Sequence, residues 1–181
     1  MIGGAAVNRK YLGDSYDAVK RLWQSIFESE LPLYAEPRFI PKELRPDFTR
    51  LTRIPLLPTS KRPHALLNDP DTGIRLPGRP NQRESREHIT VSTIAQQLED
   101  GAATCVVTFD QSQHRLADLS ALAQRTRKLE ALRELQCCGF YYVSHAPFLF
   151  AFRLRNEMQR VSRLLIEAGI PQSRLEALDD A

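Results

Sequence analysis

Acidic side chains follow two apolar segments of the sequence. Asp69 and Asp71 come directly after residues 64–68 (HALLN), and Asp110 comes directly after residues 104–109 (TCVVTF). Short apolar or β-branched runs of this kind are typical of buried strands. In an open α/β sheet the ligand site lies at the carboxyl ends of the strands, and Mg²⁺ prefers carboxylates and water as ligands. We therefore predict that Asp69, Asp71 and Asp110 hold Mg²⁺ or Mn²⁺ at one edge of the sheet.

Other groups near these segments suit catalysis. His145 follows the apolar segment 140–143, and an imidazole exchanges protons near neutral pH, as a general acid or base must. Lys20 can bind a phosphate oxygen. We expect three more polar residues to support the site: Asp14, Asp17 and Gln111. An ordinary role in turns and helix caps is the alternative for each acid, because Asp, Ser, Gly and Pro favour turns.

A basic, proline-rich arm lies between Arg38 and Arg86. It contains 11 Lys and Arg residues but only 5 Asp and Glu residues, although the whole chain has a net charge of only +3. Clustered cations of this kind bind polyanions by releasing counterions. The partner predicted from this arm is nucleic acid or a phosphorylated ligand, and the residues expected to bind it are Arg50, Arg53, Lys61 and Arg62. The alternative is a solvated, irregular arm without a ligand.

Hydrophobic spacing predicts the elements that position these residues. Val19, Leu22, Trp23, Ile26 and Phe27 recur with the period of an amphipathic helix, which Asp14 or Ser15 can cap and Pro32 ends. The remaining predicted elements are strands at 33–39, 64–68, 104–109, 140–143 and 148–154, and helices at 92–99, 116–135 and 156–168. The sequence therefore predicts a single α/β domain over residues 1–181. We expect a mostly parallel sheet with helices on both faces and a C-terminal antiparallel strand pair.

Two details of the predicted helices can be compared with a structure. Ser92 is the expected N-cap of helix 92–99, because a Ser side chain can accept a backbone hydrogen bond in the first turn. The long helix 116–135 is expected to turn its leucines toward the sheet: Leu116, Leu119, Leu122, Leu129 and Leu132.

Composition excludes several classes of protein. With 42% hydrophobic and 26% charged residues, the chain is not disordered throughout. It has no apolar run long enough to cross a bilayer and no signal-peptide pattern, so we expect a cytoplasmic protein without a membrane partner. The 3 cysteines do not indicate a disulfide framework. GxGxxG, P-loop, CxxC and HxxxH patterns are absent from the sequence, which argues against the common nucleotide and zinc sites.

Several blocks together resemble an uncharacterised bacterial family with GDxxDxxK, DPD[TN]G and FDQS motifs. The blocks are YLGDSYDAVK, NDPDTGI, EHITVSTI, VVTFDQS and YYVSHAPFL, spread over about residues 11–175. The order of NDPD, helix, strand, helix and strand pair is also similar to the C-terminal half of class I methyltransferases with a DPPY-type motif, which modify adenine. That similarity implies S-adenosylmethionine as cofactor and places Tyr11, Asp17 and Lys20 over the site. It also implies that Asp69 hydrogen-bonds to an exocyclic amine.

Three functions are consistent with these observations. The leading hypothesis is an enzyme that acts on nucleic acid or another phosphate ester through a metal-binding acidic cluster, in the manner of a nuclease or phosphodiesterase. In it Asp69, Asp71, Asp110, His145 and Lys20 are the catalytic residues. The alternatives are a shortened methyltransferase-like protein that acts on nucleic acid and a non-catalytic binding or assembly module. An active site of this kind requires the polar strand ends to share one edge of the sheet.

Overall fold

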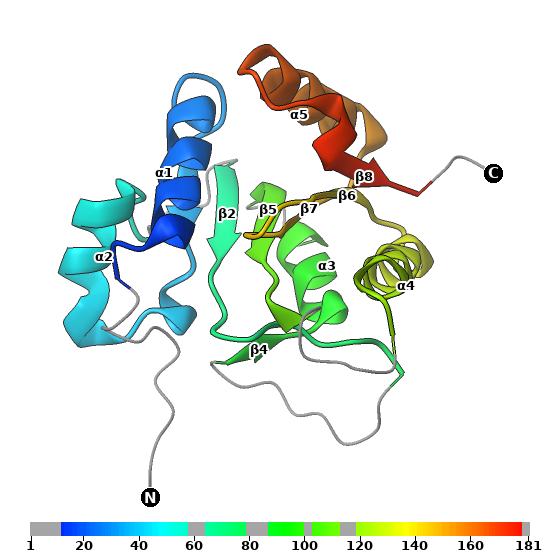
Figure 1. The fold of residues 1–181 in the computed structure, drawn as a ribbon, viewed down its shortest axis with the longest axis horizontal. Coiled ribbons are helices and arrows are strands. Elements are labelled where there is room, and N and C mark those ends of the chain that lie inside the picture. The colour runs from blue at the N-terminus through cyan, green and yellow to red at the C-terminus, as the bar shows by residue number, and fades with distance from the viewer. Residues whose placement is uncertain (1–11, 58–63, 79–86, 100–102, 113–118, 179–181) are drawn as a thin grey trace, which may run out of the picture.

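The computed structural model describes residues 12–57, 64–78, 87–99, 103–112 and 119–178 (Figure 1). Its main sheet has six strands in the order β1-β2-β5-β7-β6-β8, and a second sheet pairs β3 with β4. The strands are β1 (Leu33–Ala35), β2 (His64–Asn68), β3 (Gly73–Ile74), β4 (His88–Ile89), β5 (Ala103–Phe109), β6 (Cys138–Tyr142), β7 (Phe148–Phe152) and β8 (Leu175–Ala177).

The main sheet has a parallel part and an antiparallel part. Strands β1, β2 and β5 run parallel, whereas β7 is antiparallel to both β5 and β6, and β8 is antiparallel to β6. The predicted α/β class and the predicted C-terminal antiparallel strand pair are confirmed. The parallel pairing brings the carboxyl ends of β2 and β5 to one edge of the sheet.

Helices cover both faces of the sheet (Figure 1). Alternate residues of a strand point to the two sides of the sheet. The helices are α1 (Ser15–Phe27), α2 (Arg45–Thr52), α3 (Val91–Glu99), α4 (Ala121–Glu134) and α5 (Arg155–Glu167). Val107 of β5 belongs to a core that includes residues of α1, α2 and α5. Its neighbour Val106 belongs to a core with residues of α3 and α4. No helix within the described ranges is both long and apolar enough to cross a membrane.

The predicted irregular arm contains a helix. Helix α2 carries Pro46 in its first turn, where the missing N–H of proline removes no helical hydrogen bond. Phe48 and Thr52 are buried on its inner face. The strand predicted at 33–39 is also shorter than expected, because it ends at Ala35 and a 3₁₀ turn follows at Pro37–Phe39. The arm is therefore partly folded onto the core.

The long helix begins later than predicted and buries different residues. Ser120 caps α4 by accepting a hydrogen bond from the backbone N–H of Ala123, and Leu119 precedes the helix. Leu122 is 56% exposed, contrary to the prediction, while Leu129 and Leu132 are buried as expected. Leu116 lies outside the described residues.

The buried face of α4 also contains charged side chains, those of Arg125 and Lys128. Arg125 is buried because it forms a bidentate ion pair with Glu176 of β8, with N–O distances of 2.9 and 2.8 Å. Lys128 is fully buried because Asp110 compensates its charge. These ion pairs fix the rotation of the helix, so Leu122 points to solvent although it is apolar.

The sequence predicted Ser92 as the N-cap of α3, but the N-cap in the structure is Thr90. Thr90 Oγ1 accepts a hydrogen bond from the backbone N–H of Thr93 at 3.2 Å, and its carbonyl accepts from Ile94 at 3.2 Å. The helix accordingly begins one residue earlier, at Val91.

This assignment predicts different effects of two neighbouring substitutions. Thr90→Ala should lower the free energy of unfolding by about 1 kcal/mol, because the cap hydrogen bond is lost. Ser92→Ala should change it by less than about 0.5 kcal/mol, because Ser92 is exposed and its Oγ bonds the Thr90 hydroxyl at 2.8 Å but no backbone N–H within the described residues. Urea unfolding of both variants measures the difference, and equal effects would contradict the assignment of Thr90.

Candidate functional site

The topology brings most of the predicted site residues to one edge of the sheet. Asn68 of β2 lies opposite Thr108 of β5 in parallel register, so Asp69 and Asp110 leave their strands on the same side. Strand β6 runs in the direction of β5, because both are antiparallel to β7, and His145 therefore follows β6 at that edge. We call this the carboxyl edge.

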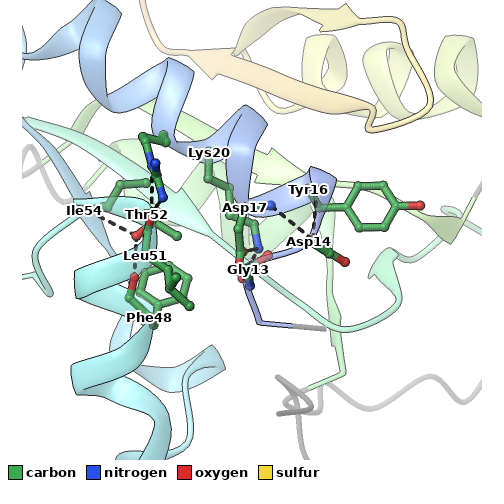
Figure 2. Close-up of polar contacts among 11 residues, drawn as sticks. Gly13, Asp14, Tyr16, Asp17, Lys20, Phe48, Leu51, Thr52 and Ile54 are labelled. Atoms are coloured by element: carbon green, nitrogen blue, oxygen red, sulfur yellow. Dashed lines mark hydrogen bonds and ion pairs between the residues drawn. The ribbon is translucent and has the colours of Figure 1, made fainter. Parts of the chain in front are cut away.

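The N-terminus of α1 supplies a second set of charges to the carboxyl edge. Asp14 is the N-cap, and its Oδ1 accepts hydrogen bonds from the backbone N–H groups of Tyr16 and Asp17 at 2.9 and 3.2 Å. One turn later, the buried Lys20 Nζ lies 3.0 Å from Asp17 Oδ1 and 2.7 Å from Asp69 Oδ2. Figure 2 shows these α1 residues beside α2. Lys20 therefore ties the first helix to the end of β2.

The group formed by Asp17, Lys20 and Asp69 has more negative than positive charge. Burial alone would lower the pKa of Lys20, but Asp69 and Asp17 outweigh it and the pKa is raised. Burial raises the pKa of Asp69; Lys20 opposes this, and the charges of Asp17 and Asp14 add to it. A single ammonium group is shared by two buried carboxylates. The group therefore favours a further cation or hydrogen-bond donor.

Asp69 has an oxygen available for such a partner. Its Oδ2 accepts the hydrogen bond of Lys20, and within the described ranges no hydrogen bond reaches Oδ1. Asp69 is 5% exposed, so the oxygen lies at the margin of the core. The ring of Phe109 lies beside the partner of this carboxylate, with its centroid 5.6 Å from Lys20 Nζ.

Asp110, by contrast, has both oxygens engaged. Lys128 Nζ and the Tyr141 hydroxyl donate to Oδ2 at 2.6 and 2.8 Å. The backbone N–H of Ile74 and the hydroxyl of Ser112 donate to Oδ1 at 3.0 and 2.6 Å. Asp110 therefore binds β3, α4 and β6 to the end of β5.

The positive charge of Lys128 decides the protonation state of Asp110. Burial would raise the pKa of Asp110, but Lys128 outweighs it together with hydrogen bonds from Ser112 and Ile74, and the pKa is lowered. Burial, followed by the negative charge of Asp110, holds the pKa of Tyr141 well above its usual range. At neutral pH Asp110 is thus a carboxylate and Tyr141 a neutral donor.

The sequence analysis missed Lys128, Tyr141 and Ser112. The available signal was weak: Lys128 precedes Leu129 and lies four residues before Leu132, so it shares their helical face. A lysine there requires a buried acid, and Asp110 was one of the three acids predicted to follow a buried strand. Tyr141 gave no comparable signal, because a tyrosine in a strand is common.

The remaining predicted residues lie after β2, β5 and β6, in α2 and at its C-terminus, or outside the described ranges. Asp71 and Gln111 are half-buried, and His145 is exposed with its ring centroid 5.9 Å from that of Tyr16. Arg50 is exposed and pairs with Asp47 at 3.0 Å, and Arg53 is exposed at the C-terminus of α2. Lys61 and Arg62 lie outside the described residues.

The structure leaves the predicted cofactors untested. In the portion of the chain that is described, no group of three or more His, Cys, Asp or Glu side chains is arranged to hold a metal ion. Mg²⁺, Mn²⁺ and S-adenosylmethionine therefore stay predictions.

Comparison with known proteins adds no assignment. No protein-family model, curated protein or solved structure matches the chain. The resemblances drawn from the sequence blocks remain predictions, and the site has to be interpreted from its own geometry.

Gly73 shows how tightly the loop after β2 is held against Asp110. Its φ is +97°, and an added Cβ would lie 2.5 Å from Asp110 Oδ1 and 2.7 Å from the backbone nitrogen of Gln111. Gly78 also has a positive φ, +84°, but nothing lies within 4 Å of its added Cβ. The two glycines form a matched pair in which only the close approach differs.

We predict that Gly73→Ala destabilises the fold more than Gly78→Ala. Backbone strain should cost each variant about 1 kcal/mol, and overpacking should cost Gly73→Ala a further 1–3 kcal/mol, roughly. Chemical unfolding of the two variants measures this difference. Similar losses would show that the loop moves freely away from Asp110.

We also predict that Lys128→Met lowers the free energy of unfolding by about 3–5 kcal/mol at pH 7, because it leaves Asp110 buried and uncompensated. The native state of the wild type holds Asp110 at a lowered pKa. Its stabilisation is therefore present above the unfolded pKa of about 3.9 and is lost as pH falls through the folded value. In the variant, burial without a compensating cation raises the pKa of Asp110, so its protonation as pH falls from 7 toward 3 should shrink the difference between variant and wild type.

The control is Arg50→Met, which removes an exposed ion pair and should change stability by less than about 1 kcal/mol. A second variant, Asp110→Asn with Lys128→Met, should recover part of the loss, because no buried charge is left. A Lys128→Met penalty that does not depend on pH would contradict the role given to Asp110.

Proposed function

We propose that the chain is a metal-dependent enzyme that hydrolyses phosphate esters, with nucleic acid as its substrate class. Asp69 is the observation that carries this proposal. Lys20 fixes its orientation through Oδ2, Oδ1 is available within the described part of the chain, and the surrounding charge is negative. A fixed, open carboxylate oxygen in an acidic environment suits a hard divalent cation.

The two acids of the DPDTG segment take the metal-binding role in this proposal. Asp69 and Asp71 would hold Mg²⁺ or Mn²⁺, which when bound lowers the pKa of a water ligand and stabilises charge on phosphate oxygens. Asp110, whose oxygens accept hydrogen bonds from Lys128, Tyr141 and Ser112, would instead keep the loop in position. We assign different roles to Asp69 and Asp110 because one oxygen of Asp69 accepts no hydrogen bond within the described residues, whereas both oxygens of Asp110 do.

The neighbouring residues fit proton transfer and phosphate binding. His145 is exposed and lies against Tyr16 in the first turn of α1, where it could exchange a proton with a bound substrate. Leu51 of α2 contacts α1, because Arg21 Nε donates a hydrogen bond to the Leu51 carbonyl at 2.8 Å. The exposed Arg50 and Arg53 flank Leu51, and with Lys61 and Arg62 they would contact phosphates.

The proposal predicts that millimolar Mg²⁺ or Mn²⁺ raises the melting temperature of the wild type, because a ligand that binds only the native state stabilises it. The same metal should support cleavage of fluorescent single- or double-stranded oligonucleotides. Asp69→Asn keeps an acceptor for Lys20 but removes the charge, so both effects should disappear. Glu130→Gln, which changes an exposed acid of α4, is the control and should retain both.

The same assays can reject the proposal. A wild type that is indifferent to both metals and leaves every oligonucleotide intact would remove the metal-dependent assignment. A metal-induced shift that persists in Asp69→Asn would place the cation elsewhere.

A methyltransferase-like function is the second candidate, and a specific observation favours it. Aromatic rings gather near Lys20, the partner of Asp69: the Phe109 centroid lies 5.6 Å from Lys20 Nζ and 5.1 Å from the Tyr16 centroid, and His145 adjoins Tyr16. A carboxylate oxygen beside aromatic rings could accept a hydrogen bond from a nucleobase amine stacked on them. Calorimetric titration with S-adenosylmethionine tests this candidate. A chain inert toward that cofactor, the metals and oligonucleotides would fit the non-catalytic alternative.

A further inference from the structure

A hollow of about 600 Å³ lies between α5 and the strand β8, away from the carboxyl edge. Figure 1 shows these two elements next to each other near the C-terminus of the chain. One face of α5 forms one wall, and β6 and the segment leading into β8 form the other. Its lining includes Phe140, Met158, Arg163, Ile166, Leu175 and Ala177. A volume of this size is typical of small-ligand sites, which span roughly 300–1,000 Å³.

The lining combines an apolar interior with one unpaired charge. Phe140 is buried, and Met158 and Leu175 are half-buried where they pack against the core. Arg163 is exposed and forms no hydrogen bond or ion pair within the described residues. Arg160 lies three residues earlier on the same helix, and it pairs with Glu157 at 3.4 Å. Of these two arginines of α5, Arg163 is the one whose charge is not already paired with an acid of the described residues.

We propose that this hollow binds a single-chain aliphatic carboxylate, with its alkyl chain against Phe140, Met158 and Leu175 and its carboxylate at Arg163. Charge complementarity selects the head group, because a guanidinium pairs with a carboxylate through two parallel hydrogen bonds. The apolar lining selects the tail, because burying methylene groups is favourable. This site shares no residue with the carboxyl edge and does not depend on the function proposed there.

The tail can be tested by varying its length. Isothermal titration of the wild type with sodium hexanoate, octanoate and decanoate should give affinities that rise up to fourfold, roughly, for each methylene that is buried. Ser162→Trp, which places a large side chain in the lining, should abolish the gain with length. Circular dichroism of this variant checks that it is folded. Affinities that do not change with chain length would overturn the proposal.

The head group can be tested by comparing two ligands on two variants. Arg163→Gln should weaken decanoate binding about two- to fivefold, the range for an exposed ion pair, and leave the binding of decanol unchanged. Arg160→Gln, which changes the paired arginine, should alter neither ligand. Equal losses for decanoate and decanol in Arg163→Gln would show that the arginine does not select the carboxylate, and would overturn the proposal.

A second copy of the chain is the other possible occupant, because Leu154 and Ile166 are 57% and 39% exposed at the two ends of α5. Sedimentation of the wild type distinguishes the two. A monomer that binds decanoate supports the proposal. A dimer that Ser162→Trp dissociates, together with no decanoate binding, would replace it with self-association through this face.

Discussion

The fully buried ion pair between Asp110 and Lys128 holds together the elements that build the carboxyl edge. Transferring two charges out of water is expensive, and their attraction compensates only when further hydrogen bonds satisfy both groups. Tyr141, Ser112 and the backbone of Ile74 supply those bonds to the carboxylate. As a result β3, β5, β6 and α4 can pack in few other ways, because any shift that separated them would leave a charge unsatisfied in the core.

Asp69 and Asp110 lie at the same edge of the sheet but differ in their hydrogen bonding and in the direction of their pKa shifts. Asp69 and Asp110 each come directly after a strand, and the two strands are parallel neighbours. Asp110 has both oxygens occupied and a lowered pKa, whereas Asp69 shares Lys20 with Asp17 and has a raised pKa. The negative charge of Asp110 in the interior is fully compensated, whereas that of Asp69 at the margin of the core is compensated only in part. This difference is the physical reason for assigning a structural role to Asp110 and a binding role to Asp69.

Much of the framework was predictable from local pattern, and the errors have a common cause. The β-branched run before Asp110 and the apolar stripe of α1 identify their elements because burial in those elements follows the period of the backbone. The predictions for Leu122 and Ser92 were wrong, because the ion pairs of α4 and the hydroxyl of Thr90 decide the structure at these positions. The pairing of Lys128 with Asp110 joins residues 18 positions apart through tertiary packing. A pattern in one segment cannot identify a partner in another.

Helix α1 shows how a short spacing can still determine the geometry of the candidate site. Asp14, Asp17 and Lys20 are three residues apart, so successive side chains lie on nearly the same face of the helix. The first caps the helix, the second joins the backbone of Gly13 to Lys20, and the third reaches Asp69 on the sheet. Moving Lys20 by one position would turn its ammonium away by about 100°. Asp69 would then be buried beside Asp17 with no cation between them, so the orientation of its free oxygen depends on this one spacing.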